Sequence, residues 1–385
     1  MLFVEGMRQD SDTDSNTETD TMPEGFVGDA GPWEWTDFPD AGDCDVEGCK
    51  QLTFGDSVDL LEWDVWGDLL VVADDAVDKT LVVNCIDNKY LEIPNVFPSI
   101  SDTSSIGVFY PATIYEQMVC YGQKVYSEDD IENVICANLE AQTQILVYCR
   151  KQNGPDSPNP AKYSDLYGTR FVSMGGCGDV MDSWPLCEFD TTEPGTYQEL
   201  APHFYGSHNS MWGDIVVWYT EIDGYHIQAY DFSTSTQFNI TDDDEVQFNP
   251  RIHGSRVVYQ DLRFGDGGSP MASWAHSAVF MYDLGTHETT QITSGEWIAA
   301  YPDVHENIIV WADYRASADP NDAESFSGVE IWGYNVDTET EFQITNIPGR
   351  GKTTPRIWGD KVFVQMYKAS GGDAIYMFDL PDGAK

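Results

Sequence analysis

A short unit recurs seven times along this chain: an aromatic or histidine residue, a two-residue polar turn, and an apolar run rich in β-branched residues. It is clearest at Trp212-Gly213-Asp214, which is followed by Ile215-Val216-Val217. A polar break containing glycine between two apolar runs predicts a tight turn between antiparallel strands. The unit begins at Trp66, Tyr115, Tyr167, Trp212, His253, His305 and Trp358, a mean spacing of about 49 residues. That spacing is typical of one four-stranded blade of a β-propeller, so we expect an all-β fold of seven blades.

The last four repeats resolve into four strands, which we name a to d in chain order. Strand a contains a proline in three of them (Pro250, Pro302 and Pro355), and strand b is the apolar run. Strand c ends in an aromatic residue followed by Asp or Asn, at Tyr230, Tyr282, Tyr334 and Phe378; the first three lie 52 residues apart. Strand d ends in Ile-Thr at 240–241, 292–293 and 344–345. Repeats two and three follow this pattern more loosely.

The seventh repeat ends near residue 382 without a strand d. The missing piece is present at the other end of the chain, where Gln51-Leu52-Thr53 copies the Gln-Ile-Thr ending. We therefore expect residues 51–53 to complete the last blade, which closes the ring and removes two exposed sheet edges. The propeller then spans residues 51–385.

Two segments precede it. Residues 1–30 are rich in Asp, Glu, Ser and Thr and poor in apolar residues, which predicts a disordered acidic tether. Its composition resembles the spacers that follow the lipid-bearing cysteine of bacterial surface lipoproteins, although that cysteine is not in this sequence. Residues 31–50 contain Trp33, Trp35 and Phe38 beside Cys44 and Cys49, and we expect this lead-in to dock on the propeller.

Charge is the unusual bulk property: 66 acidic residues against 19 basic ones give a formal net charge of -47. Such a surface repels nucleic acid, whose binding needs Lys and Arg, and it repels anionic lipid surfaces. High solubility, adaptation to salt, capture of divalent cations and a cationic partner all remain open.

Eight cysteines suggest disulfides, because none of them forms a C-x-x-C pair and no second pair or histidine lies at zinc-site spacing. We expect local bonds between Cys44 and Cys49 and between Cys177 and Cys187. Three pairings are open among Cys85, Cys120, Cys136 and Cys149; Cys120 and Cys136 flank a turn symmetrically, so they could face each other across a hairpin.

Disulfides imply an oxidising compartment, so we expect an extracellular, cell-surface or periplasmic location. No apolar run is long enough to span a membrane. Residues 1–7 are too short and too acidic for a signal peptide, and we expect an export signal to have been removed or to lie upstream.

These motifs resemble the TolB-like (WD40-like, PD40) β-propeller repeat of secreted and surface proteins of bacteria and archaea. The residues that carry the resemblance are Val257–Arg263, Ile309–Arg315, Tyr282–Leu284 and the Ile-Thr endings. The resemblance covers about residues 51–385, most clearly in the last four blades. It implies a propeller but no particular chemistry, because members include binding scaffolds, translocation proteins and lyases of the oligogalacturonate type.

Long connections between strands b and c are where we expect binding. They fall at about 173–187, 264–277 and 316–328, on the face opposite the short a–b turns. Their candidate binding residues are Trp184, Trp274, His276 and Phe326, since exposed aromatic residues suit carbohydrate stacking or a protein interface. The alternative is that these side chains pack inward and stabilise their own loops.

Two acidic clusters are candidate Ca²⁺ ligands, because carboxylates without basic partners suit a hard cation. They consist of Asp242, Asp243 and Asp244 in one loop and Asp319, Asp322 and Glu324 in another. Neither has EF-hand spacing, so solvated acidic loops are the alternative. His203 and His208 are a weaker metal candidate.

The repeated pairs Asp261/Arg263 and Asp313/Arg315 predict a structural role, with the Asp capping a turn and the Arg pairing with a neighbouring carboxylate. His253 and His305 occupy the aromatic position of the repeat and are predicted to be structural.

The sequence has no G-x-S-x-G nucleophile motif of hydrolases, no phosphate-binding loop and no dinucleotide-binding motif, so no catalytic residue is proposed. The leading interpretation is a non-catalytic module that binds a protein or glycan at the cell surface. The alternatives are a metal-assisted, polysaccharide-active propeller enzyme of the lyase type and a structural component of a surface assembly. The sequence specifies neither the ligand nor the oligomeric state.

Overall fold

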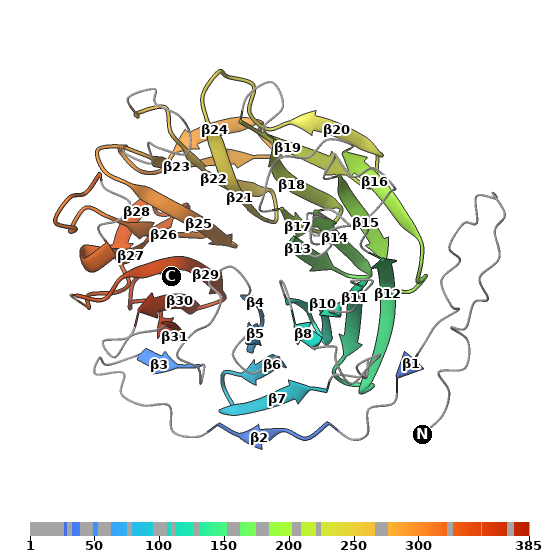
Figure 1. Cartoon of the computed structure of the whole chain (residues 1–385). Coiled ribbons are helices and arrows are strands. Elements are labelled where there is room, and N and C mark those ends of the chain that lie inside the picture. Colours follow the sequence, from blue (N-terminus) through green and yellow to red (C-terminus); the bar gives the residue numbers. More distant parts are fainter. Residues whose placement is uncertain are drawn as a thin grey trace.

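Seven antiparallel sheets are arranged around a central axis, like the blades of a propeller (Figure 1). The computed structural model describes residues 27–28, 33–38, 49–52, 63–74, 79–94, 106–108, 112–125, 131–151, 162–174, 185–201, 209–220, 225–265, 276–321, 326–347, 349–367 and 373–384. The predicted all-β, seven-bladed fold is confirmed.

Each blade has strands a to d in the expected order, with strand a nearest the axis (Figure 1); in blade two, two short strands take the place of strand a. Blades one to three consist of β4 (Trp63–Trp66), β5 (Leu69–Asp74), β6 (Lys79–Asn84), β7 (Lys89–Ile93); β8 (Ile106–Val108), β9 (Thr113–Tyr115), β10 (Met118–Val125), β11 (Ile131–Asn138), β12 (Thr143–Lys151); and β13 (Lys162–Tyr167), β14 (Arg170–Met174), β15 (Leu186–Asp190), β16 (Tyr197–Ala201). In blade two, β8 and β9 both pair with β10.

Blades four to seven are more regular. They consist of β17 (Ser210–Trp212), β18 (Ile215–Thr220), β19 (His226–Asp231), β20 (Thr236–Asn239); β21 (Gln247–His253), β22 (Arg256–Asp261), β23 (Ala278–Asp283), β24 (Glu288–Gln291); β25 (Ala299–His305), β26 (Ile308–Asp313), β27 (Glu330–Asn335), β28 (Thr340–Gln343); and β29 (Lys352–Trp358), β30 (Lys361–Tyr367), β31 (Asp373–Asp379) with β3 (Cys49–Gln51). One short 3₁₀ helix, η1 (Phe326–Gly328), lies before β27.

The apolar runs of strand b explain the core. Successive residues of a strand point to opposite faces, so Val216 packs against blade three and Val217 against blade five. Val257 and Val258 divide in the same way between blades four and six. The buried apolar side chains form seven clusters, one between each pair of neighbouring blades. A blade is therefore apolar on both faces, which is why its central strands read as continuous apolar runs.

Strand β3 closes the ring. It pairs antiparallel with β31, matching Cys49 with Phe378 and Gln51 with Tyr376. Leu52 continues the contact: its N–H donates to the carbonyl of Ile375, and its side chain is buried between blades seven and one. The predicted closure by the N-terminal segment is thus confirmed, with the strand at 49–51.

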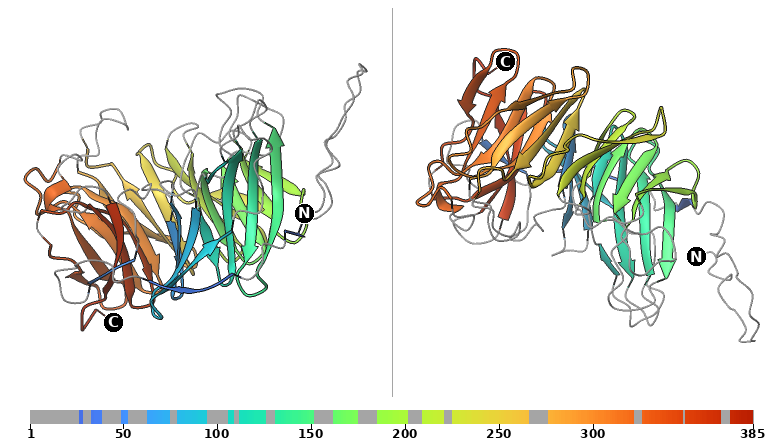
Figure 2. Two further views of the ribbon diagram at one scale, coloured as in Figure 1. Left: turned by 60° about the horizontal axis from the view of Figure 1, so that its bottom comes forward. Right: turned by 90° about the horizontal axis from the view of Figure 1, so that it is seen from above.

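The lead-in also adds a strand to each of the next two blades (Figures 1 and 2). β2 (Thr36–Asp37) extends blade one beside β7, and β1 (Val27–Gly28) extends blade two beside β12. Trp33 and Phe38 on either side of β2 are buried in the clusters on the two faces of blade one. Within the described residues, the chain before β3 therefore contacts the propeller at Val27–Gly28 as well as at residues 33–38.

The repeated turn residues have local hydrogen-bonding roles. Asp231, Asp283 and Asn335, at the end of strand c, each accept backbone N–H groups two and three residues ahead and so cap the c–d turn. The threonines of the Ile-Thr endings accept a backbone N–H from strand c of the same blade; the pairs are Thr241 with Ile227, Thr293 with Val279, and Thr345 with Ile331. These contacts explain why the two motifs recur.

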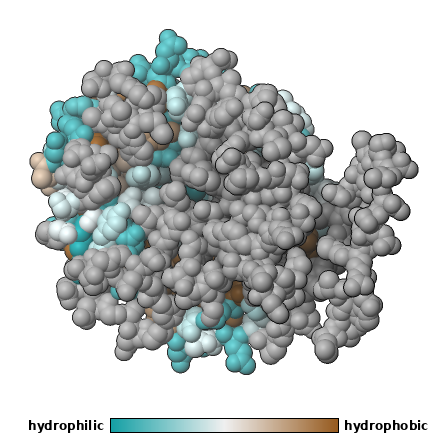
Figure 3. Space-filling model, viewed as in Figure 1, coloured by the Kyte–Doolittle hydropathy of each residue, from teal (hydrophilic) through white to brown (hydrophobic). Residues whose placement is uncertain are grey.

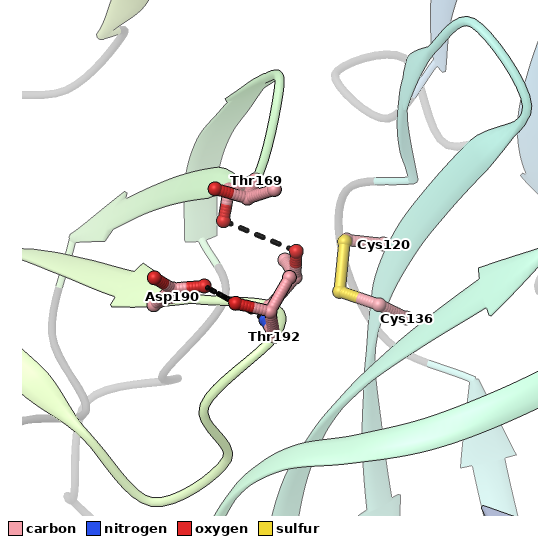
Figure 4. The surroundings of a disulfide bond; sticks show 6 residues. Cys120, Cys136, Thr169, Asp190 and Thr192 are labelled. Atoms are coloured by element: carbon pink, nitrogen blue, oxygen red, sulfur yellow. Dashed lines mark hydrogen bonds between the residues drawn. A yellow bond between two sulfur atoms is a disulfide. The ribbon is translucent and has the colours of Figure 1, made fainter.

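Cys120 and Cys136 face each other on β10 and β11 and form a disulfide, which resolves one of the open pairings (Figure 4). The bond is buried between blades two and three. Cys85 is a free thiol, and its burial raises the pKa to about 12. Cys49 and Cys187 are also disulfide-bonded. Their predicted partners, Cys44 and Cys177, lie outside the described residues.

The described surface lacks a broad apolar area. On the face drawn in Figure 3, the hydrophobic colour of the described residues is confined to small, separated spots. The exposed large apolar side chains of this part of the chain are Trp35, Ile86, Tyr197 and Phe264, which belong to four different elements or loops. None of the described helical segments has the length and hydrophobicity needed to cross a membrane.

Deleting residues 1–53 tests ring closure. The deletion removes β1, β2 and β3 together with buried Trp33, Phe38 and Leu52, each worth about 2–3 kcal/mol of apolar burial. We expect the melting temperature measured by circular dichroism to fall by roughly 10 °C or more. Deleting residues 1–26 is the control, and it should leave the melting temperature unchanged. Equal melting temperatures for both truncations and the full chain would contradict the closure argument.

Candidate functional site: the central channel

The inner strands bring the repeat residues to the axis of the propeller. In blades five to seven, strand a has a β-bulge at Asn249, Tyr301 and Thr354, each of which has a positive φ. The following residue is the repeated proline, which lacks an N–H for the ladder and is tolerated at a bulge. After the bulge, alternate residues of strand a face the axis.

The seven aromatic or histidine residues of the repeat form one ring at the a–b turn end of the channel. Neighbouring members around the ring, including the closing pair Trp358 and Trp66, have ring centroids 3.8–5.2 Å apart. Some also meet across the axis, with Trp66 and Trp212 stacked at 5.8 Å. We call this set the aromatic ring; its members are Trp66, Tyr115, Tyr167, Trp212, His253, His305 and Trp358. Their side chains fill this end of the channel.

The two histidines link neighbouring blades. His253 Nδ1 accepts the N–H of Glu306 in blade six at 3.0 Å, and His305 Nδ1 accepts the N–H of Gly359 in blade seven at 3.3 Å. Both bonds require an unprotonated Nδ1. Burial, reinforced by the neighbouring His305, lowers the pKa of His253 to about 4, and burial also lowers the pKa of His305. The structural role predicted for both histidines is thus confirmed, and it depends on their neutral form.

A second ring lies two residues earlier on each inner strand, about 6–7 Å along the channel. We call it the polar ring; its members are Asp64, Thr113, Asp165, Ser210, Arg251, Asp303 and Arg356. Several members reach the next blade: Asp64, Asp165, Ser210 and Asp303 accept the backbone N–H of Ile114, Met211, Ile252 and Ile357, respectively. The polar ring therefore joins blades as well as lining the channel.

Charge is distributed unevenly around the polar ring. Arg251 Nε donates to Asp303 Oδ1 at 2.9 Å, and the Asp303 side chain is 7 % exposed. Burial opposes the charge on Arg251, but Asp303, Asp165 and Asp64 outweigh it and raise the pKa of this guanidinium. Burial and the nearby Asp64 raise the pKa of Asp165. These carboxylates repel one another, but each accepts a backbone N–H that holds it in place.

Arg356 is the exception. It makes no ion pair within the described part of the chain, its Nε is buried without a hydrogen-bond partner there, and its Nη1 donates to the carbonyl of Pro355. Its guanidinium lies 5.7 Å from the centre of the Trp63 ring. Burial and the nearby Arg251 lower the pKa of Arg356 to about 10, although Asp303, Asp64 and Asp165 act in the opposite direction.

A cavity of about 50 Å³ lies between the two rings. Its walls include Asp64, Asp165, Arg251 and Asp303 of the polar ring, and its floor includes Trp66, Trp212, His253, His305 and Trp358 of the aromatic ring. At about 10–15 Å³ for each water, this space holds roughly three to five water molecules or one small polar ligand.

The predicted binding residues are only partly placed. Trp184 and Trp274 lie outside the described residues, as does the side chain of Phe326, although Phe326 itself begins η1. His276 is half-buried, and its N–H donates to Asn321 Oδ1, linking the long loops of blades five and six. Their role in binding stays a prediction.

The predicted metal ligands do not converge in the described residues, where no three His, Cys, Asp or Glu side chains are grouped as a metal site. Asp243 instead pairs with Arg263 Nη2 at 2.8 Å, while Asp242, Asp244 and Asp319 are exposed. Asp322 and Glu324 lie outside the described residues, as do His203 and His208. A Ca²⁺ role for either loop stays a prediction.

The structural role of the Asp-x-Arg pairs is confirmed. Asp261 and Asp313 accept the backbone N–H and the Nε of the arginine two residues later. Arg263 also reaches Asp243, and Arg315 reaches Glu341 at 2.6 Å. Arg315 further stacks on Trp332 at 3.9 Å. These contacts fix the base of the long b–c loops in blades five and six.

The polar ring and its cavity were not foreseen from the sequence. The available signal was positional: every member lies two residues before the aromatic position, and alternate residues of a strand share a face. The residue types vary from Thr and Ser to Asp and Arg, so no motif marks them.

Comparison with solved structures supports the fold. The β-propeller domain of the Trilobed protease from Pyrococcus furiosus is similar with a TM-score of 0.57 and 11 % identity, over 85 % of this chain and 95 % of that one. An oligogalacturonate lyase from Vibrio parahaemolyticus is similar with a TM-score of 0.54 and 13 % identity, over 93 % and 100 %. An oligogalacturonate lyase in complex with manganese gives 0.53 and 12 %, over 94 % and 100 %. No protein-family model matches the sequence, and no curated protein matches it.

The histidines predict a pH-dependent stability. Because the pKa of His253 is about 4 when folded and near 6.5 when unfolded, the unfolded chain binds more protons between these values. The contribution of neutral His253 to the stability of the fold is therefore complete above about pH 6.5 and is lost as the pH falls toward 4. We expect the double variant His253→Phe/His305→Phe to lose less melting temperature than the wild type between pH 7 and pH 5. His287→Asn, outside the ring, is the control and should follow the wild type. Parallel pH profiles for all three proteins would contradict this role.

The pair Arg251–Asp303 is predicted to be strongly coupled. Asp303→Asn leaves a carbonyl for the N–H of Ile357 but removes the charge opposite Arg251, so we expect a loss of about 3 kcal/mol in the free energy of unfolding. The double variant Arg251→Met/Asp303→Asn should recover part of that loss, because no uncompensated charge remains. Urea unfolding of the wild type, Asp303→Asn, Arg251→Met and the double variant measures the coupling, and additive effects would show that the pair is not coupled.

Proposed function

We propose that this chain is an exported, non-catalytic propeller that binds a protein or glycan through the face carrying the long b–c loops. The observation that carries the proposal is the difference between the two ends of the channel. The aromatic ring fills the end with the short a–b turns. The opposite face receives the connections 175–185, 262–277 and 314–329, which are long enough to form a recognition surface on a rigid frame.

The bases of two of these loops support such a role. Asp261/Arg263 and Asp313/Arg315 fix the backbone where strand b ends, and the contact of His276 with Asn321 joins the two loops. Binding residues on firmly anchored loops lose less conformational entropy when a ligand binds. The aromatic candidates Trp184 and Trp274 would supply the contact area.

Export is supported by the disulfide chemistry. Cys120–Cys136 is a buried disulfide, and both Cys49 and Cys187 are disulfide-bonded. Disulfides persist in oxidising compartments and are rare where thiols are kept reduced. The net charge of -47 suits a soluble surface module and favours a neutral or cationic ligand.

The non-catalytic interpretation rests on the polar ring. The carboxylates of Asp64, Asp165 and Asp303 accept backbone N–H groups and, for Asp303, a guanidinium. Carboxylates that are hydrogen-bonded in this way link neighbouring blades, which favours a structural role over a catalytic one. The likeness to an oligogalacturonate lyase in complex with manganese concerns the fold, and a metal-assisted lyase activity is the competing outcome of the test below.

Binding is tested with immobilised protein against an array of neutral and acidic polysaccharides and against cell-surface extract, with and without a calcium chelator. We expect a retained ligand whose affinity falls at least tenfold in the double variant Trp184→Ala/Trp274→Ala. Trp35→Ala, an exposed tryptophan on the lead-in, is the matched control and should bind as the wild type does. Equal binding by the loop variant, or cleavage of a polysaccharide with release of unsaturated ends, would overturn the proposal.

A further inference from the structure

Lys352, the first residue of strand β29, is completely buried at the end of blade seven that carries the long connections, which we call the loop face. Its side chain is 0 % exposed. The corresponding first residues of strand a are Gln247 in blade five and Ala299 in blade six, so the repeat itself does not require a lysine here. A buried ammonium group is costly unless its donors and its charge are both satisfied.

Four oxygen atoms surround this ammonium group. Nζ donates to the carbonyls of Val329, Ile347 and Arg350 at 3.0, 2.7 and 2.9 Å, respectively. Glu330 Oε2 lies 3.2 Å away and forms the ion pair. Three carbonyls match the three N–H donors of a lysine, and the carboxylate balances its charge. Burial lowers the pKa of Lys352, and Glu330 opposes that shift.

The acceptors belong to two different connections of the loop face. Val329 is the last residue of the b–c loop of blade six, whereas Ile347 and Arg350 lie in the d–a connection between β28 and β29. Glu330 strengthens the same junction: its Oε1 accepts the N–H of Ile347 at 3.0 Å, and its Oε2 accepts the hydroxyl of Thr345 at 2.5 Å. The side chain of Lys352 therefore links two segments that lie outside the strands.

The end of this b–c loop is closely packed. The carbonyl of Ser327 accepts the N–H of Gly349 in the d–a connection at 3.1 Å. Gly328 approaches the start of the same loop so closely that a Cβ atom there would meet the carbonyl oxygen of Ala316 and the Cα of Ser317. Because the two ends of the loop pack on each other, holding Val329 also restrains the start of the loop.

We propose that Lys352 is a positioning residue of the loop face, whose ammonium acts as a built-in cation and holds the b–c loop of blade six against the d–a connection of blade seven. The ladder of β29 and β30 is formed by the backbone, so loss of this side chain releases the two connections while blade seven stays paired. A loop held in one conformation loses less entropy when a ligand binds. The inference rests on the function proposed above only for the use of this loop in binding.

Limited digestion with trypsin tests this role without a ligand, so it can fail separately from the proposed function. The bond Arg350–Gly351 contains one of the carbonyls that Lys352 holds. We would digest the full chain under native conditions and measure cleavage of this bond by mass spectrometry, relative to cleavage of Arg170–Phe171 at the start of β14. The second bond, in blade three, reports on opening of the whole ring.

In Lys352→Met, the ratio of the two cleavage rates should rise at least tenfold, because local opening exposes only the bond after Arg350. Peptides that span this bond with Lys or Met at position 352 correct for any difference in intrinsic cleavage. Lys361→Met removes a lysine of the same blade that pairs with Asp379 at the surface. It is the matched control and should keep the wild-type ratio.

The double variant Lys352→Met/Glu330→Gln separates hydrogen bonding from charge balance. It leaves no unpaired buried charge at this junction, so it should melt at a higher temperature than Lys352→Met does. Its cleavage ratio should nevertheless stay at least tenfold above the wild-type value, because the three carbonyls still lack their donor.

Two results would refute the positioning role of Lys352. An unchanged ratio in Lys352→Met would show either that the connections stay in place without the ammonium or that the whole ring opens instead. A wild-type ratio in the double variant would show that charge balance, and not hydrogen bonding by Lys352, holds the loop.

Discussion

The pairing of β3 with β31 is the contact on which the closed ring depends. Each of the seven apolar clusters lies between two blades, so no blade has a core of its own. The cluster between blades seven and one includes Leu52, which directly follows β3. Without that strand, β31 would present an unpaired edge and Leu52 would be missing from the layer. A contact between residues more than 320 apart in sequence thus completes a structure whose other contacts are mostly between neighbouring repeats.

The channel combines two solutions to the same geometric problem. Seven inner strands converge on one axis, and their side chains have to fill or line the space that remains. At the a–b turn end, flat rings of Trp, Tyr and His pack against one another at tilted angles and fill it. One step along the strands, shorter polar and charged side chains leave a cavity and bond instead to the backbone of the next blade. The histidines share features of both rings, because they pack against neighbouring rings and also accept an N–H from the following blade.

Much of the fold could be predicted from the sequence because the repeat is local. The aromatic position, the turn, the apolar run and the Ile-Thr ending each report on contacts within one blade, and seven copies reveal the period. The copy of the ending at Gln51-Leu52-Thr53 even indicated the ring closure. The extension of blades one and two by β1 and β2 could not be predicted, because two-residue strands such as Val27–Gly28 and Thr36–Asp37 carry no periodicity. The polar ring was harder to predict than the lead-in strands. Arg356 and Asp303 look like ordinary surface charges in the sequence, and only the bulges at Thr354 and Tyr301, with their positive φ, place them toward the axis.

The order of the lead-in strands has a mechanical consequence. Along the chain, β1 meets blade two, β2 meets blade one and β3 meets blade seven, so the segment runs around the rim against the direction in which the blades follow one another. Tension applied at the N-terminus therefore reaches the three strands one after another. Because β1 and β2 each pair over only two residues, they would detach before the load reached β3, and the ring would stay closed meanwhile. A propeller attached by this end would absorb a pull in steps, with the ring opening only at the last of them.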